Sequence, residues 1–146
     1  MIYWITGEPG SGKTTFSIKL KEAIDAYYKR EIAILIDGDA VRNEFDSYNN
    51  KVNGFTMNGI KNQIHRCLSM ARIINSQGFI PICALVSPTV ELRQVLTGDS
   101  QVSLIHTPID PEKSILWVNS NYEIPIKEEC AKSPKYMLDL FDNSRR

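Results

Sequence analysis

The sequence predicts an α/β fold of three layers, in which a mainly parallel sheet is flanked by helices on its two faces. Apolar runs of strand length alternate along the chain with stretches of helical periodicity. The first of these runs leads into a glycine-rich turn that opens a helix. The chain has 146 residues, of which 42% are hydrophobic and 23% charged. We therefore expect a single domain over residues 1–146 with one hydrophobic core.

The first half of the chain contains two expected strands, each followed by a helix. The apolar run Ile2–Thr6 predicts the first strand, and a helix is expected to start at Lys13. The apolar face of that helix is formed by Phe16, Leu20, Ile24 and Tyr27. Residues 32–36 are wholly apolar, as in a strand that is buried on both faces. A short helix over 40–45 and a polar, asparagine-rich loop over 47–54 are expected next.

A long helix is predicted over residues 58–76, and Gly78 is well placed to end it. Its apolar face is formed by Ile60, Ile64, Leu68, Ala71 and Ile74. Residues 79–86 predict a further buried strand, and Ser87-Pro88 then indicates a helix with proline at its first position. The remaining expected elements are weaker strands over 101–107 and 115–118, and a last helix that starts at Ser133-Pro134 and carries Tyr136, Leu140 and Phe141.

The turn after the first strand carries a phosphate-binding motif. Residues 7–14 read G-E-P-G-S-G-K-T and match G-x-x-x-x-G-K-[ST], the P-loop, in its required place between a strand and a helix. Its backbone N–H groups and the helix N-terminus favour bound anions. Lys13 is expected to reach the β- and γ-phosphates of ATP, and Thr14 to bind Mg²⁺. The residues expected to hold the nucleotide are Gly7, Glu8, Pro9, Gly10, Ser11, Gly12, Lys13, Thr14 and Thr15. The sequence therefore predicts a P-loop NTPase fold.

Phosphoryl transfer also needs an acid that organises Mg²⁺ or accepts the proton of the nucleophile. Ligands bind beyond the carboxyl ends of parallel strands, so Asp37, Asp39, Val86 and Ser87 are expected near the P-loop. Among these strand ends, only the one after residue 36 supplies carboxylates, Asp37 and Asp39, which favours a catalytic role for this acidic turn. A tight polar turn is the alternative interpretation of Asp37-Gly38-Asp39. The chain contains neither the guanine-reading motif Asn-Lys-x-Asp nor an Asp-x-x-Gly switch, which disfavours a GTPase.

Composition narrows the classes of partner and compartment. Basic and acidic residues number 17 each, so the net charge is zero. This balance disfavours a general nucleic-acid binder and leaves a local basic groove open. No apolar stretch is long enough to span a membrane. Met1 leads almost directly into the first strand, so no signal peptide is expected, and the three cysteines lack metal-ligand spacing. We expect a cytoplasmic protein with reduced thiols.

Several motifs, in order, resemble those of the adenylylsulfate kinase family. That family reads approximately G-x-x-G-S-G-K-S-T, then D-G-D-x-x-R, G-F-S, I-S-P with a later arginine, and Y-E-x-P. The matching residues here are 7–15, Asp37-Gly38-Asp39-Ala40-Val41-Arg42, Gly54-Phe55-Thr56, Val86-Ser87-Pro88 with Arg93, and Tyr122-Glu123-Ile124-Pro125. The similarity covers residues 3–93, nearly two-thirds of the chain.

The resemblance implies a kinase that moves the γ-phosphate of ATP to the 3′-hydroxyl of adenylyl sulfate, with Lys13, Asp37 and Ser87 in catalysis. Asp37 would be the base or metal organiser, and Asp39 and Val86 would lie beside the acceptor. Arg42 would bind the anionic groups of the acceptor, and Phe55 would stack on its adenine. Arg42 could instead be a solvated charge, and Phe55 a core residue. The family also tends to form homodimers.

Ser87 matches a serine that the family carries as a phosphorylated intermediate. In-line transfer by positioning needs no covalent intermediate, and a serine that opens a helix is also a common cap.

Two departures from the family pattern leave other functions open. An Asp-Arg pair and a Glu-Asn pair of the family are replaced by Gly59-Ile60 and Asn62-Gln63, so an acceptor-binding arginine is missing unless another residue replaces it. The candidates for that replacement are Lys61, His65 and Arg66. The basic lid of the family is also missing, because residues 107–121 contain only Lys113 as a basic residue. The alternatives are a P-loop kinase for another hydroxyl (a nucleic-acid 5′ end, a modified nucleobase or a sugar) and a nucleotide-binding module without catalysis.

Overall fold

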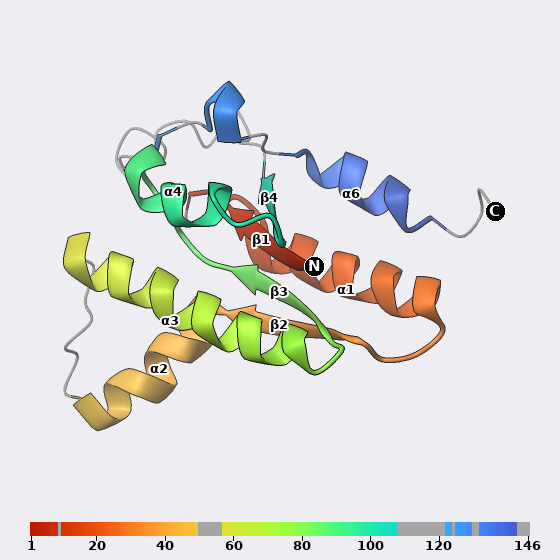
Figure 1. Cartoon of the computed structure of the whole chain (residues 1–146), viewed down its shortest axis with the longest axis horizontal. Helices are drawn as coiled ribbons and strands as arrows, with labels where there is room; N and C mark the ends of the chain where they lie inside the picture. The colour runs from red at the N-terminus through yellow and green to blue at the C-terminus, as the bar shows by residue number, and fades with distance from the viewer. Residues whose placement is uncertain (9, 50–56, 108–121, 124, 130–131, 143–146) are drawn as a thin grey trace.

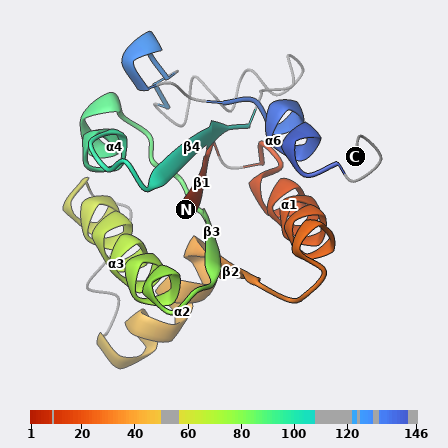
Figure 2. The ribbon, with the colours of Figure 1, turned by 45° about the vertical axis from the view of Figure 1, so that its right-hand side comes forward.

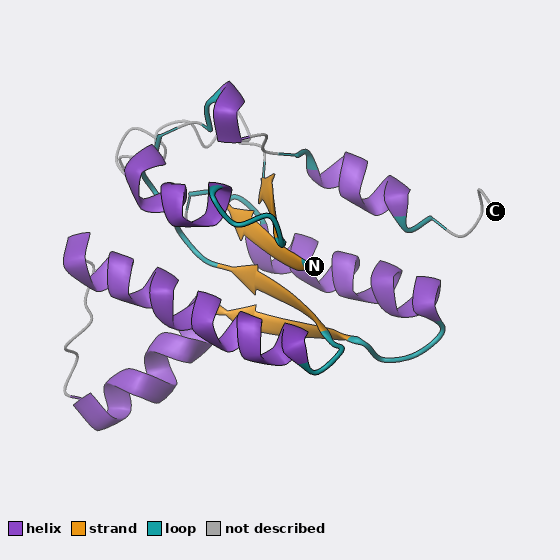
Figure 3. Cartoon of the chain, viewed as in Figure 1, coloured by secondary structure: helices purple, strands orange, loops and turns teal. Residues whose placement is uncertain are grey.

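The computed structural model describes the chain apart from residues 9, 50–56, 108–121, 124, 130–131 and 143–146 (Figure 1). In chain order the elements are β1 (Ile2–Thr6), α1 (Lys13–Tyr28), β2 (Ala33–Asp37), α2 (Gly38–Asn49), α3 (Met57–Ser76), β3 (Ile80–Ala84), α4 (Val90–Thr97), β4 (Val102–His106), the 3₁₀ turn η2 (Lys127–Glu129) and α6 (Pro134–Leu140). Strands and helices alternate over most of the chain, as Figure 3 shows.

The described strands form one parallel sheet with the order β2-β3-β1-β4. In register, Tyr3 of β1 lies opposite Ile82 of β3 and Ser103 of β4. All carboxyl ends therefore meet at one edge of the sheet. Because β1 lies between two strands that follow it in sequence, its P-loop opens at the middle of that edge, where ligands bind in open α/β sheets.

Helices cover both faces of the sheet: α1 and α6 lie on one face, and α3 and α4 on the other (Figure 2). β1 contributes side chains to the hydrophobic clusters on both faces of the sheet, because successive side chains of a strand point to opposite faces. Ile2 and Trp4 belong to the cluster beneath α3 and α4. Tyr3 and Ile5 belong to the cluster beneath α1 and α6. The predicted three-layer α/β fold is thus confirmed.

Most predicted elements are present with small changes in their bounds, and two predictions about the first half are wrong. Ile34 and Leu35 of β2 are 37% and 39% exposed, so this strand is not buried on both faces. The reason is that β2 is an outermost strand of the sheet, and an apolar run does not reveal this position. The helix expected over 40–45 is α2 and extends over Gly38–Asn49, so residues 47–49 are helical rather than loop. The rest of that predicted loop lies outside the described residues.

The predicted helix start at Ser87-Pro88 is also wrong. α4 begins at Val90, and its N-cap is Thr89, whose hydroxyl accepts a hydrogen bond from the N–H of Leu92 (3.1 Å). By contrast, Ser133 caps α6 as expected, with proline in the first turn. The strand predicted over 115–118 lies outside the described residues. Among the helices that the structure describes, none is long and apolar enough to cross a bilayer.

Candidate active site

The P-loop has the backbone conformation of a phosphate-binding turn. Gly10 and Gly12 have φ angles of 81° and 92°, which favour glycine over any residue with a Cβ. Gly12 is the N-cap residue of α1. It has no side chain that could accept a hydrogen bond from the first N–H groups of the helix. The first N–H groups of α1 therefore lie at the turn without a side-chain cap, an arrangement that suits an anionic ligand.

Gly7 allows the loop to pass close to the end of β4. A Cβ at this position would overlap the hydroxyl of Thr107 and lie 2.5 Å from Ser11 Oγ. Ser11 and Thr107 share a hydrogen bond of 2.7 Å between their hydroxyl groups, and the backbone N–H of Thr107 donates to the carbonyl of Thr6 (2.9 Å). The P-loop is thereby attached to the strand next to β1.

Lys13 is the first residue of α1, and its ammonium group folds back over the loop. Lys13 Nζ donates to the carbonyls of Gly7 (3.0 Å) and Glu8 (2.7 Å). Burial lowers the pKa of Lys13 from 10.5 to about 8, although nearby carboxylates, first that of Asp39, act in the opposite direction. A cation that is partly desolvated in this way gains from an anionic ligand.

The acidic turn after β2 also starts α2. Asp37 Oδ1 accepts a hydrogen bond from the N–H of Asp39 (3.0 Å), as an N-cap residue does. Asp39 forms an exposed ion pair of 3.4 Å with Arg42, one helical turn further on. Both sequence interpretations of this segment therefore find support, because the turn is polar and tight and it also lies at the candidate site.

One cavity of about 610 Å³ unites the P-loop with this turn, and its volume suits a nucleotide. Its lining residues are Gly10, Gly12, Lys13, Thr14, Thr15, Asp37, Asp39, Arg42, Ala84, Leu85 and Val86. They come from the carboxyl ends of β1, β2 and β3 and from the helices that follow. The structure thus brings together most of the residues that the sequence singled out.

A second cavity of about 510 Å³ lies between α1 and α6. It shares Gly12 and Thr15 with the first cavity. Phe16 and Leu138 give it apolar walls, and Lys19 lies at its border. The P-loop therefore borders two cavities.

Oxygen ligands suitable for Mg²⁺ lie in the first cavity. Thr14 and Asp37 both line it. Within the described part of the chain, no three His, Cys, Asp or Glu residues are grouped as a metal cage. One hydroxyl and one carboxylate fit Mg²⁺, which usually binds through one or two protein oxygens together with water and substrate phosphates.

Ser87 is not among the residues that line the first cavity. Its side chain is completely buried, and its Oγ accepts a hydrogen bond from Trp4 Nε1 (3.1 Å). The Ser87 hydroxyl is thus engaged with Trp4 rather than exposed in the cavity, whereas the preceding residue, Val86, lines it. Glu8 is 1% exposed and also lies outside the lining. Pro9 and Phe55 lie outside the described residues.

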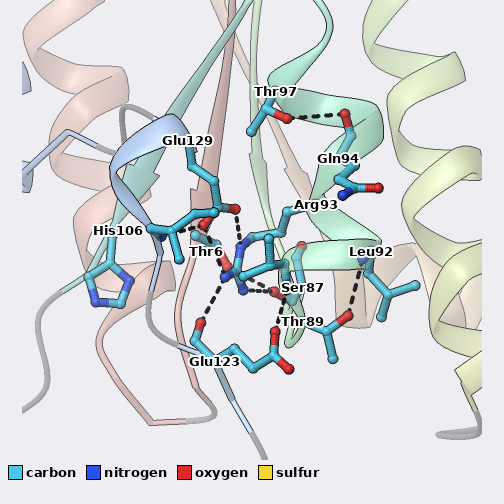
Figure 4. A network of polar contacts seen from close by, with 12 residues as sticks. Thr6, Ser87, Thr89, Leu92, Arg93, Gln94, Thr97, His106, Glu123 and Glu129 are labelled. Carbon is cyan, nitrogen blue, oxygen red and sulfur yellow. Dashed lines mark hydrogen bonds and ion pairs between the residues drawn. The ribbon is translucent and has the colours of Figure 1, made fainter.

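A buried network around Arg93 was not identified from the sequence as a structural feature (Figure 4). Arg93 Nε donates to Glu129 Oε1 (2.6 Å), Nη1 to the carbonyl of Ser87 (2.6 Å) and Nη2 to the carbonyl of Glu123 (2.8 Å). The guanidinium carbon lies 5.1 Å from the centre of the Tyr122 ring. Arg93 therefore joins α4 to segments 30 or more residues further along the chain.

Tyr122 extends this network to the strand before the P-loop. Its hydroxyl shares a hydrogen bond of 2.8 Å with Thr6 Oγ1 and one of 3.2 Å with His106 Nδ1. Burial and the nearby charge of Arg93 lower the pKa of His106, which favours its neutral form. Thr6 immediately precedes Gly7, so the C-terminal part of the chain contacts the base of the P-loop.

Comparisons with known proteins identify relatives of this chain. The family model described as "Adenylylsulphate kinase" matches residues 1–109. The "Adenylyl-sulfate kinase" of Burkholderia ambifaria is 37% identical over 92 residues, which are 63% of this chain and 48% of that protein. The enzyme of that name from Staphylococcus carnosus is 32% identical over an alignment of 168 positions, covering 99% of this chain and 77% of that protein. The chain spans about half the length of the first relatives.

Solved structures show the same architecture. The hexameric APS kinase from Thiobacillus denitrificans superposes with a TM-score of 0.61 at 26% identity, covering 85% of this chain and 23% of that one. An unliganded sugar kinase from a Janibacter species superposes with a TM-score of 0.67 at 13% identity, covering 95% and 90%. At that low identity, the second likeness concerns the fold alone.

Proposed function

The chain belongs to the adenylylsulphate kinase family, and from this premise we propose that it transfers the γ-phosphate of ATP to the 3′-hydroxyl of adenylyl sulfate. One observation carries the proposal. The 610 Å³ cavity has the P-loop on one wall and, on the other, the acidic turn with Arg42. Phosphoryl transfer requires the donor and the acceptor to be positioned together, and this cavity offers a binding surface for each.

The donor wall would bind ATP through the backbone N–H groups of the P-loop and the start of α1. Lys13 would leave its contacts with the loop carbonyls and donate to the β- and γ-phosphates. The hollow between α1 and α6 has the apolar walls that a nucleobase needs, and it lies directly beside Gly12 and Thr15. Thr14 and Asp37 would hold Mg²⁺, which supplies positive charge to the transferred phosphoryl group when bound.

The acceptor wall would position the hydroxyl for in-line attack. The acceptor oxygen forms a bond to the γ-phosphorus while the bond from that phosphorus to the β,γ-bridging oxygen breaks. The proton of the acceptor would pass to the Asp37 carboxylate, which already accepts a hydrogen bond from Asp39 N–H. Arg42, which lines the cavity, would bind the anionic part of the acceptor. Ser87 takes no part in this route, because its hydroxyl is buried against Trp4.

A different hydroxyl acceptor is the second candidate, and two positions on α3 support it. Ile60 packs against the hydrophobic core. Gln63 is buried, and its amide NH₂ group donates a hydrogen bond to the carbonyl of Gly38. Neither residue is a cation of the kind that the family resemblance leads one to expect near these positions. On the wall built from residues 37–42, Arg42 is the cation that lines the cavity.

Phosphate transfer from radiolabelled ATP, with Mg²⁺ and the full chain, tests these possibilities. The acceptors are adenylyl sulfate, an oligonucleotide with a free 5′-hydroxyl, nucleosides and simple sugars. Label on adenylyl sulfate supports the proposal, whereas label only on another acceptor moves the function to the second candidate. Binding of MgATP with no labelled product identifies a module without catalysis, and absence of binding overturns all three.

The carboxylate variant Asp37→Asn tests the proposed role of the acidic turn. We expect its rate of transfer to fall by about 100-fold or more, with the affinity for metal-free ADP retained because the P-loop is unchanged. Asp99→Asn is the matched control, because Asp99 is paired with Arg72 and does not line the cavity. Equal losses in the two variants would contradict a catalytic role for Asp37.

A further inference from the structure

Two polar side chains of α3 contact the acidic turn and the helix that follows it. Gln63 is 2% exposed, and its Nε2 donates to the carbonyl of Gly38 (2.5 Å), between Asp37 and Asp39. Arg66 Nη2 donates to Gln63 Oε1. The same guanidinium lies 4.4 Å from the centre of the Phe45 ring on α2. α2 starts at the tip of β2 next to α3, so the Gln63 contact reaches the acidic turn and the Arg66 contact reaches the helix that follows it (Figure 1).

The chemistry of these contacts fixes the orientation of the Gln63 amide. Its NH₂ group faces a carbonyl oxygen and its oxygen faces a cation. The flipped amide would place two donors against each other at Arg66 and two acceptors against each other at Gly38. A buried amide that is satisfied on both sides has one favourable position, and it holds its partners there.

The turn has little room to move away from this contact. A Cβ at Gly38 would lie 2.6 Å from the Cβ of Leu85, so the backbone of the turn is packed directly against the end of β3. Leu85 itself lines the cavity. Gly38 thus lies between the Gln63 amide and the cavity wall, and a shift of its carbonyl would move Asp37 and Asp39 on either side.

We propose that Gln63, oriented by Arg66, is a positioning residue that sets the Asp37 carboxylate against the acceptor hydroxyl. The inference rests on the proposed kinase function. Neither side chain is among the residues that line the 610 Å³ cavity. Arg66 therefore does not replace the missing acceptor arginine by direct contact. It acts on the acceptor wall through Gln63 and also packs against Phe45 of α2.

The test uses Gln63→Glu and Arg66→Met in the full chain. Gln63→Glu keeps the size of the side chain and an oxygen for Arg66, but at neutral pH it removes the donor to Gly38. A misplacement of a catalytic group by about 1 Å can cost about 100-fold in rate. We therefore expect kcat with the identified acceptor to fall by about 10- to 100-fold in both variants. The Kd for metal-free ADP should change less than about threefold, since the P-loop is not touched.

Two controls separate positioning from general damage to the fold. Gln63→Asn retains both amide functions at a shorter reach, and it should recover part of kcat. Arg72→Met removes the same type of side chain from the same helix, where Arg72 pairs with Asp99 far along the chain. It should leave kcat and KM unchanged. Hydrogen exchange of the amides of residues 38–42, measured without any substrate, reports on the turn itself.

Faster exchange in residues 38–42 together with reduced kcat and retained affinity for metal-free ADP supports the proposal. Unchanged exchange in both variants overturns it. Faster exchange with unchanged kcat, or a loss of affinity for metal-free ADP in proportion to kcat, also overturns it. If the parent chain phosphorylates no acceptor, the proposed function fails. Exchange in residues 38–42 then decides whether Gln63 holds the turn.

Discussion

Replacing Arg93 by methionine should cost more stability than any surface change in this chain. Arg93 is completely buried, and its partner Glu129 has a side chain that is 3% exposed. The guanidinium donates to both carboxylate oxygens of Glu129 and to the carbonyls of Ser87 and Glu123. Arg93→Met leaves the carboxylate and both carbonyls without this donor. The carboxylate keeps the N–H of Ile126, which donates to Oε2 (2.8 Å).

The size of the effect follows from the desolvated carboxylate. Removal of one partner of a buried ion pair costs about 3–5 kcal/mol, because the remaining charge stays in an environment of low polarity. With an m-value of roughly 2 kcal/mol per molar urea, the midpoint should fall by about 1.5–2.5 M. Urea denaturation of the full chain, followed by tryptophan fluorescence, measures this shift. Trp4 is completely buried and donates to Ser87, so its emission reports on this network.

The double variant Arg93→Met/Glu129→Met distinguishes a buried ion pair from a loss of packing. Because replacement of both charges by apolar groups is often nearly neutral, the double variant should be more stable than Arg93→Met alone. A single variant that loses less than about 1 kcal/mol would refute the reasoning. A double variant that loses the sum of the two single effects would refute it as well, since the two charges would then be uncoupled.

Three further effects follow from the site. MgADP affinity should fall about tenfold from pH 7 to pH 9, because the pKa of Lys13 is about 8 and only the ammonium form attracts phosphate; calorimetry that finds constant affinity would contradict this. Gly7→Ala should weaken nucleotide binding, because its methyl group forces the hydroxyl groups of Ser11 and Thr107 to move, whereas Gly98→Ala, where a Cβ meets no atom closer than 3.5 Å, should bind normally. Tyr122→Phe loses hydrogen bonds of 2.8 and 3.2 Å, together about 2 kcal/mol, and should lower Tm by about 4–8 °C.

The predictions from sequence that succeeded depend on local patterns. β1 and the start of α1 occur where the apolar run and the P-loop motif indicated, because strand, turn and helix in this motif are consecutive. Asp37 and Lys13 could be assigned to one cavity since carboxyl ends of parallel strands share an edge. Each of these inferences required only the order of neighbouring elements.

The features that were missed depend on contacts between distant positions. The exposure of Ile34 and Leu35 follows from the strand order, in which β2 is an edge. The Arg93–Glu129 pair spans 36 residues, and the bond from Gln63 to Gly38 spans 25. A single sequence contains no periodicity that would connect such positions.

The Arg93 network also links residues 1–109, which the family model matches, to the segment that follows them. Within that range, Arg93 and Thr6 are buried, yet Glu129 and Tyr122 are partners that lie beyond it. Without the later residues, a buried cation would lose its carboxylate, and the hydroxyl before the P-loop would lose its shortest hydrogen bond. The donor wall thus depends on the C-terminal segment, whereas the acceptor wall depends on α3 through Gln63. Changes near Glu129 should therefore weaken folding and nucleotide binding together, while changes at Gln63 should alter transfer with nucleotide binding retained.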